Sequence, residues 1–214
     1  MIKRSSNRRK SKINRKTSET KITGELVVDG RGKIDIKTGI GFLDHMLTLM
    51  AFHGLFDLKL RAKGDLNVDI HHSNEDVAIC LGQAFKRALG AGRGIRRFGS
   101  SEVPMDHARA RVTIDIANRF AYTGILLRNG KFQQALSEIK SSKTGENYSM
   151  EDGNDFLETF AKNLNMNLHI NVLSESDMHH MLEAIFKALG IALDRATEID
   201  PRRKKSIPSS KGIL

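Results

Sequence analysis

Hydrophobic residues follow two different spacings along the chain, and these spacings predict an order of strands and helices. Apolar residues that alternate with polar ones are typical of a half-buried strand, whereas apolar residues three and four apart are typical of a helix. Gly54 and Gly90 stand where two helices are expected to end, and Ser73 is expected to cap the second one. In the first half of the chain, the patterns predict two strands in 21–39, a helix in 40–53, a strand in 55–70 and a helix in 73–89.

The same order of patterns returns in the second half of the chain. It predicts two strands in 108–127, a helix in 155–165, a strand in 166–173 and a helix in 176–196. Each half is therefore strand, strand, helix, strand, helix. This self-similarity predicts an α+β protein with internally duplicated halves, in which two sheets have helices packed on one face.

Polar and basic segments flank the two halves. Residues 1–16 contain no acidic side chain, and we expect them to form a flexible basic arm. We place the first half in 17–95 and the second in 96–200, with a long polar surface loop near 128–150. A basic segment, 201–214, follows the second half.

Composition narrows the class of protein. The chain has 214 residues, 39% of them hydrophobic, which is enough for a buried core, and no apolar run is long enough to span a membrane. Cys80 is the only cysteine, so an internal disulfide is excluded and a reducing compartment fits. We expect a cytoplasmic protein and leave organellar targeting by the basic arm open. The net charge of +10 raises nucleic acid as a partner, but the arm lacks the interleaved aromatic residues of single-strand binders.

Two clusters of the form His-His-x-x-Glu mark the last predicted helix of each half. They consist of His71, His72 and Glu75 in the first half and of His179, His180 and Glu183 in the second. In a helix, residues four apart share a face, and adjacent residues diverge by about 100°. One helix cannot easily present both histidines and the glutamate to one ion. Two ions, each held by a His and a Glu four apart and by a histidine from another segment, satisfy the geometry.

The side chains of the clusters indicate the kind of metal. Imidazole and carboxylate ligands suit Mn²⁺, Fe²⁺ or Zn²⁺ better than Mg²⁺ or Ca²⁺. His45 lies in the apolar stretch "FLDHMLTL" and could be a hydrogen-bonded core histidine, but the two clusters favour it as a further ligand. The alternatives for both clusters are structural metal sites and surface histidines that cap helices. The repeat, together with the lack of cysteine ligands, favours a catalytic site.

A second set of residues indicates an anion site. Ser209, Ser210 and Lys211 offer hydroxyl, backbone N–H and ammonium donors of the kind that bind phosphate. Lys187 lies one helical turn after Glu183, where an ordinary Glu–Lys ion pair is the alternative.

The remaining cations and histidines are less distinctive. Arg97 and Arg119 are candidates for phosphate contacts, with a solvated arginine as the alternative for each. His53 fits either an anion contact or a helix C-cap. We expect His169 to be structural and assign no role to His107.

Together these residues resemble the imidazoleglycerol-phosphate dehydratase family. The resemblance covers nearly all of the chain after about residue 16 and rests on "FLDHML", "FHGLFD", "DIHHSNEDVA", "GIRRFG", "HHMLEAIFKAL", "ATEIDPRR" and "IPSSKG". It implies a carbon–oxygen lyase that converts imidazole glycerol phosphate to imidazole acetol phosphate in histidine biosynthesis. It also implies two Mn²⁺ per active site, bridged by the imidazolate of the substrate. The subunits of the family assemble into a large homo-oligomer with active sites at interfaces.

The resemblance also implies roles for residues of this chain. The first ion would be held by His45, His72, His179 and Glu183, and the second by His71, Glu75, His180 and the residue at position 155, which is Asp155 here. Glu19 matches a substrate-contacting glutamate and is our candidate general acid/base. The phosphate contacts implied are His53, Arg97, Arg119, Lys187, Ser209 and Lys211.

The chain departs from the family pattern in a few places. Asp155 stands where the family has a histidine ligand, His107 where it usually has an acid, and Gly41 where a proline is common, and the loop at 128–148 is longer than usual. A divergent dehydratase with a weakened second metal site is therefore one alternative. The others are a dinuclear metal phosphoester hydrolase and a basic nucleic-acid-binding protein with structural metals.

Overall fold

The computed structural model describes residues 8–127, 148–204, 206–212 and 214. In the first half of the chain the elements are β1 (Lys10–Lys16), β2 (Lys21–Val27), β3 (Ile34–Lys37), α1 (Gly41–His53), β4 (Asp57–Lys63) and α2 (His71–Leu89). In the second half they are β5 (Phe98–Met105), β6 (Ala108–Asp115), β7 (Ala121–Leu127), α4 (Met150–Leu164), β8 (Asn167–Ser174) and α5 (Met178–Thr197). The two halves thus have the same order of elements, which confirms the predicted duplication.

Each half forms one four-stranded sheet, and the two sheets have equivalent connections. The strand orders are β1-β2-β4-β3 and β5-β6-β8-β7. In each sheet the first three strands of this order pair antiparallel, and the last pair, β3 with β4 or β7 with β8, is parallel. Residues in these strands alternate between buried and exposed, as expected of a sheet with one covered face.

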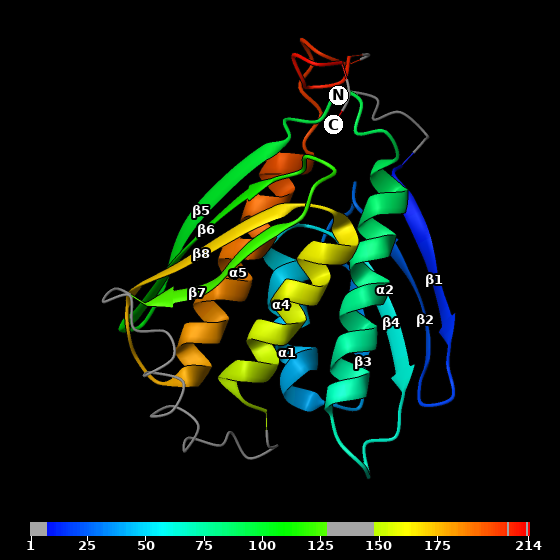
Figure 1. The fold of residues 1–214 in the computed structure, drawn as a ribbon, viewed down its shortest axis with the longest axis vertical. Coiled ribbons are helices and arrows are strands. Elements are labelled where there is room, and N and C mark those ends of the chain that lie inside the picture. The colour runs from blue at the N-terminus through cyan, green and yellow to red at the C-terminus, as the bar shows by residue number, and fades with distance from the viewer. Residues whose placement is uncertain (1–7, 128–147, 205, 213) are drawn as a thin grey trace.

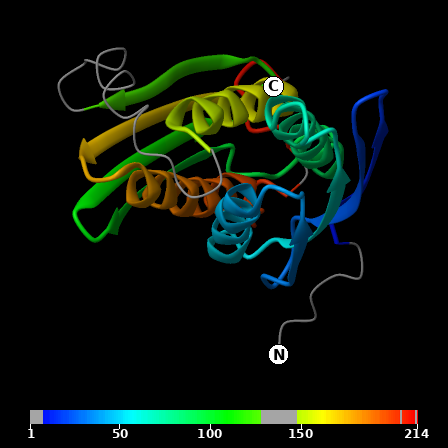
Figure 2. The same ribbon diagram turned by 90° about the horizontal axis from the view of Figure 1, so that it is seen from below.

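The helices lie between the two sheets. Figure 1 shows one sheet at each side of the molecule and the helices α1, α2, α4 and α5 between them, and Figure 2 shows the same layers from below. Across the middle, α2 packs against α4 and α1 packs against α5. The α+β prediction of two sheets with helices on one face is confirmed, and one hydrophobic core runs through both halves.

Glycines at equivalent places let these helices approach closely. Gly82 of α2 and Gly190 of α5 each lie eleven residues after the first histidine of their own cluster. An ideal Cβ on Gly190 would lie 2.3 Å from the carbonyl oxygen of Met50 in α1, and one on Gly82 would lie 2.6 Å from that of Phe160 in α4. Any side chain at these two positions would therefore collide with the backbone of the facing helix.

The first strand of each half differs from our expectation. We predicted a flexible arm for 1–16, but Lys10–Lys16 forms β1 and pairs with β2 along its whole length, from Lys10 opposite Val27 to Lys16 opposite Lys21. Only Ile13 of this strand is a buried apolar residue, so the alternating signal was too weak to detect. Residues 1–7 lie outside the described part of the chain.

Strand β5 was missed for a related reason. The buried positions on its covered face are Gly99 and Ser101, and the apolar Val103 and Met105 that follow on this face are only partly buried. An ideal Cβ on Gly99 would lie 2.0 Å from the carbonyl oxygen of Ala192, so α5 packs directly on the strand backbone. Because glycine has no side chain, a strand that packs closely through Gly99 shows no alternating hydrophobic pattern in its sequence.

Two of the four predicted helices also begin at other residues than we expected. Helix α2 begins at His71, and Ser73 is a buried residue within it instead of its N-cap. Helix α4 begins at Met150, five residues before the predicted start, within the segment 128–150 that we read as loop. Most of that predicted loop, 128–147, lies outside the described residues.

The early start of α4 has a local cause, and it yields a prediction. The side chain of Ser149 accepts a hydrogen bond from the backbone N–H of Asp152 at 3.1 Å, and the Asp152 carboxylate accepts one from the N–H of Ser149 at 2.7 Å. This capping box satisfies two N–H groups of the first turn. We expect Ser149→Ala to lower the free energy of unfolding by about 1 kcal/mol, measured by urea denaturation.

The control for this change is Ser176→Ala, because Ser176 precedes α5 but the N-cap of α5 is Asp177. The control should be nearly neutral. Equal losses from both substitutions would contradict the assignment of the cap.

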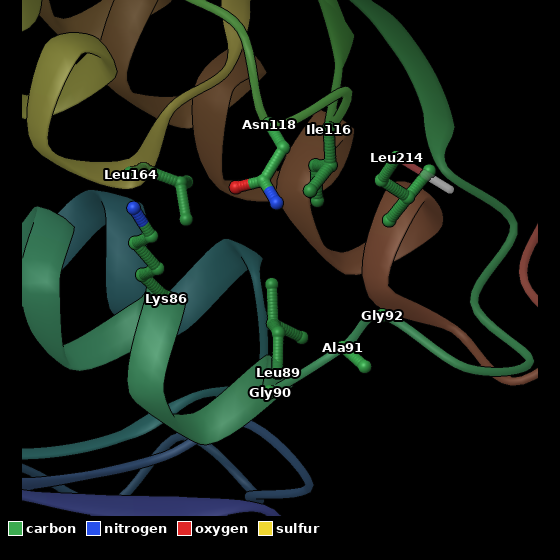
Figure 3. A pocket seen from close by; sticks show the side chains of 9 residues that line it. All are labelled: Lys86, Leu89, Gly90, Ala91, Gly92, Ile116, Asn118, Leu164 and Leu214. Carbon is green, nitrogen blue, oxygen red and sulfur yellow. The ribbon is translucent and has the colours of Figure 1, made fainter.

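A small pocket joins the two halves near the end of α2. Figure 3 shows its lining, which includes Leu89, Ile116, Leu164 and Leu214. Gly92 has a φ of +64°, and an ideal Cβ there would lie 2.4 Å from Cδ1 of Leu214. The positive φ favours glycine at this position. The side chain of Leu214 lies in the pocket among residues of both halves. None of the helices in the described ranges is long and apolar enough to cross a bilayer.

Candidate functional site

One group of candidate ligands is assembled from α1 and α5. The ligand atoms of His45, His179 and Glu183 all lie within 4.8 Å of one another. Nε2 of His45 is 2.6 Å from Oε1 of Glu183, and Nε2 of His179 is 3.2 Å from the same oxygen. His179 and Glu183 share a face of α5 as their spacing predicted, and His45 reaches them because Gly190 allows α1 to approach. Two imidazoles and a carboxylate suit a first-row transition metal.

The carboxylate of this group is held in its ionised form. Burial of Glu183 by itself raises the pKa, but hydrogen bonds from Lys187 and His45 outweigh this effect and lower the pKa to about 2. The ammonium of Lys187 lies 2.8 Å from Oε2 of Glu183. A carboxylate that stays ionised at neutral pH is ready to bind a cation.

His72 lies in a different cluster from the one the resemblance implied. Its Nδ1 is 3.2 Å from Oδ2 of Asp65 and 3.8 Å from Oε2 of Glu19, so two carboxylates face the same ring nitrogen. The hydrogen bond to Asp65 is the main cause that raises the pKa of His72, and the charge of Glu19 adds to it. With Nδ1 engaged in this way, Nε2 is the nitrogen left for a metal.

Asp155, a candidate ligand of the second ion, has the same place in the second half as His45 has in the first. His45 lies five residues before Met50 in α1, and Asp155 lies five residues before Phe160 in α4, so both occupy the same place relative to the glycine contact. Asp155 is therefore the counterpart of His45. Burial raises the pKa of Asp155, and the nearby charge of His71 opposes that shift.

Among the residues that the structure describes, His71, Glu75, His180 and Asp155 do not converge on a common point as the first group does. Nδ1 of His180 instead makes a short hydrogen bond to Asp177, the N-cap of α5, and its Nε2 lies 3.5 Å from Asp106. The interaction with Asp177 orients the ring of His180. The assignment of these residues to a second ion stays a prediction.

The candidate phosphate contacts fall into two places. In the first, His53 lies near Lys187, and burial and that positive charge together lower the pKa of His53. Lys187 itself pairs with Glu183, so the Glu–Lys pair that we named as the alternative is present and lies beside the metal group.

In the second place, Arg97 binds both oxygens of Asp115, at 2.6 and 2.9 Å, and also donates to the carbonyl oxygen of Pro208 at 3.1 Å. Arg97 therefore anchors the segment that carries the candidates Ser209, Ser210 and Lys211.

The rest of the anion set is solvent-accessible. The side chains of Ser210, Lys211 and Arg119 are exposed, and Ser209 is half-buried with its hydroxyl accepting from the N–H of Lys211 at 3.2 Å. His107 and His169 are also exposed, on a turn and on β8.

Three carboxylates that support these residues were missed from sequence. Asp65 faces His72, Asp115 binds Arg97, and Asp177 caps α5 and orients His180. Asp177 had a usable signal, because an aspartate just before a helical pattern is a favoured N-cap. Asp65 and Asp115 reach their partners only through tertiary packing, so local patterns carry no sign of them.

Comparisons with known proteins point to one family. The family model "Imidazoleglycerol-phosphate dehydratase" matches residues 38–193. A protein of that name from a Thermoanaerobacter species is 50% identical over 207 residues, covering 96% of this chain and 100% of the relative. Another from Syntrophobacter fumaroxidans is 47% identical over 211 residues, covering 97% of this chain and 98% of the relative.

Solved structures agree with the sequence comparisons. A crystal structure of IGPD from Pyrococcus furiosus has a TM-score of 0.73 and 33% sequence identity, covering 94% of this chain and 100% of that one. The structure of imidazoleglycerol-phosphate dehydratase from Staphylococcus aureus has a TM-score of 0.69 and 28% identity, covering 89% of this chain and 99% of that one.

Proposed function

Because the chain belongs to the imidazoleglycerol-phosphate dehydratase family, we propose that it dehydrates imidazole glycerol phosphate with two metal ions held by its His-His-x-x-Glu clusters. Family membership makes the protein a hydro-lyase of histidine biosynthesis. The observation that carries the metal dependence is the group of His45, His179 and Glu183, whose ligand atoms lie within 4.8 Å of one another.

The donor set of this group fits a divalent ion such as Mn²⁺. His45, His179 and Glu183 would hold the first ion, with His72 as a further ligand. His71, Glu75, His180 and Asp155 would hold the second, and the equivalence of Asp155 with His45 supports its place in that set. A carboxylate suits Mn²⁺ as well as an imidazole does. When bound, the two ions would supply Lewis-acid charge that stabilises the substrate ring as an imidazolate between them.

Side chains of the protein would move the proton and hold the phosphate. Glu19, 3.8 Å from His72, would transfer the carbon-bound proton as general acid/base while the neighbouring carbon loses its hydroxyl. The resulting enol would ketonise to imidazole acetol phosphate. His53 and Lys187 lie beside the metal group, and Arg97, Arg119, Ser209, Ser210 and Lys211 would supply the remaining phosphate contacts.

We also propose that the active sites are completed where copies of the chain meet. His72 and the second-ion candidates do not join the first group within the described part of one chain, so a neighbouring copy can bring the two sets together. Phe52, Phe98 and Phe120 are 59%, 60% and 40% exposed, and large exposed apolar side chains are common at protein interfaces. A cytoplasmic location fits the single reduced cysteine.

Removal and return of the metal tests the proposal. We expect a chelator to abolish the formation of imidazole acetol phosphate and Mn²⁺ to restore it, because the charge that stabilises the substrate anion comes from the ions. Metal analysis should give close to two Mn²⁺ per subunit. Full activity without metal would overturn the metal dependence.

The same assay separates the alternatives. Release of inorganic phosphate without loss of water would assign a phosphoester hydrolase. A single tightly bound ion per subunit would show that Asp155 does not complete a strong second site.

A further inference from the structure

The turn that contains Glu19 is hydrogen-bonded to α2 near the start of that helix. This turn, residues 17–20, joins β1 to β2. The hydroxyl of Thr20, which is only 4% exposed, donates a short hydrogen bond to Oδ2 of Asp76. Asp76 is 7% exposed and lies in α2 directly after Glu75, one of the candidate ligands. A buried hydrogen bond thus connects the turn to the helix of the metal cluster.

The other oxygen of the same carboxylate holds the opposite side of the turn. Nε and Nη2 of Arg15, near the end of β1, lie 2.8 and 2.7 Å from Oδ1 of Asp76. Arg15 precedes the turn and Thr20 ends it, so the carboxylate of Asp76 accepts hydrogen bonds from both ends of the turn. A charge-assisted pair with a buried carboxylate gives the contact a defined geometry.

Hydrogen bonds inside the turn carry this constraint to Glu19. The hydroxyl of Thr17 accepts from the backbone N–H groups of Glu19 at 3.2 Å and Thr20 at 2.9 Å, and lies 3.2 Å from the Thr20 hydroxyl. The backbone of Glu19 is therefore fixed by two threonines, and its carboxylate lies 3.8 Å from Nδ1 of His72.

We infer that Thr20 is a positioning residue that, by its bond to Asp76, holds Glu19 beside His72 for the proton transfer. The inference rests on the proposed function, in which Glu19 is the acid/base. The side chain of Glu19 is 49% exposed, so no packing of its own fixes it and its position depends on the backbone of the turn. A displacement of about 1 Å can cost about 100-fold in rate when a reacting group must be aligned.

The test compares Thr20→Val, which keeps the shape but loses the hydroxyl, with Thr20→Ser, which keeps the hydroxyl. We expect Thr20→Val to lower kcat by about 10- to 100-fold, with little change in KM or in Mn²⁺ per subunit. Thr20→Ser should restore kcat. In a Glu19→Gln background, Thr20→Val should cause no further loss, because the residue acts through Glu19.

The matched control is Ser11→Ala. Ser11 is also a buried hydroxyl that connects β1 to α2, since it accepts from Nε of Arg87 at 3.0 Å, but it lies at the end of β1 opposite to the turn. We expect Ser11→Ala to leave kcat unchanged. Equal kcat values for Thr20→Val and Ser11→Ala, or an additive loss in the Glu19→Gln background, would overturn the inference.

A second measurement reads the position of the turn without any activity. The N–H groups of Glu19 and Thr20 should exchange faster with solvent in Thr20→Val than in the parent chain or in Thr20→Ser. Unchanged exchange would also overturn the inference. A parent enzyme that forms no imidazole acetol phosphate would contradict the proposed function, whereas the exchange rates would still decide whether Thr20 holds the turn.

Discussion

Replacing Glu183 with glutamine is expected to lower the rate of dehydration by about two to three orders of magnitude and to abolish tight metal binding at the group of His45, His179 and Glu183. Glu183 supplies the only carboxylate of this group, and both histidines lie within 3.2 Å of it. Glutamine has almost the same shape but no charge, and it leaves the ammonium of Lys187 without its partner at 2.8 Å. Metal content and kcat of the purified variant measure the effect.

The matched control is Glu198→Gln, at the end of the same helix. Glu198 also pairs with a cation, Arg96, at 2.7 Å, but both side chains are about half exposed. Exposed pairs of this kind contribute about 0–1 kcal/mol, so the control should keep its metal and its activity. A Glu183→Gln variant with normal Mn²⁺ content would remove Glu183 from the ligand set.

The low pKa of Glu183 sets the direction of its pH dependence in the metal-free protein. The pKa is about 2 in the folded chain and 4.5 is the ordinary value, so the folded state favours the ionised form. The stabilisation is therefore fully present above pH 4.5 and is lost as the pH falls towards 2. Mild acid therefore leaves Glu183 ionised and does not have the effect of the Glu183→Gln substitution.

The second large effect is expected from Gly190→Ala, which should lower the free energy of unfolding by about 1–3 kcal/mol and weaken metal binding. The added Cβ would lie 2.3 Å from the carbonyl oxygen of Met50 and 3.1 Å from the nitrogen of Gly54. Both atoms belong to backbone, so α1 and α5 must move apart. That movement lengthens the 2.6 Å contact between His45 and Glu183, which bridges the same two helices. Urea denaturation and a Mn²⁺ titration measure the two effects.

Gly153→Ala provides the control, because it makes the same substitution within helix α4. The nearest atoms to its Cβ are Cδ2 of Leu182 at 2.8 Å and Cδ1 at 3.3 Å, the ends of a flexible side chain. Alanine favours a helix over glycine, so this variant should be close to neutral. A Gly190→Ala variant as stable as Gly153→Ala would show that α1 and α5 do not need this close approach.

The sequence was sufficient to predict what depends on local spacing. The duplicated halves, most helices and the shared face of His179 and Glu183 follow from periods of two and 3.6 residues. The spacing also predicted that each ion needs a ligand from another segment, and the structure brings His45 of α1 to His179 and Glu183 of α5.

Other features could not be predicted because they depend on small residues or on tertiary contacts. Strands β1 and β5 bury few large apolar side chains, so they have no strong alternating pattern. The role of Asp76 depends on Arg15 and Thr20, which lie 61 and 56 residues away in sequence. No local pattern in the sequence connects residues that lie so far apart along the chain.

The two contacts between the halves have a consequence for the symmetry of the chain. In each, the last helix of one half packs through its glycine on the first helix of the other, so a single contact occurs twice. This is the arrangement of an isologous dimer whose two protomers have been joined. The helices of each half pack on their own sheet with one face and on the helices of the other half with the opposite face. A half made alone should therefore be stable only when two copies pair about a twofold axis. In such a pair the two proposed ligand sets would be identical, whereas in this chain the equivalent positions carry different residues, His45 and Asp155.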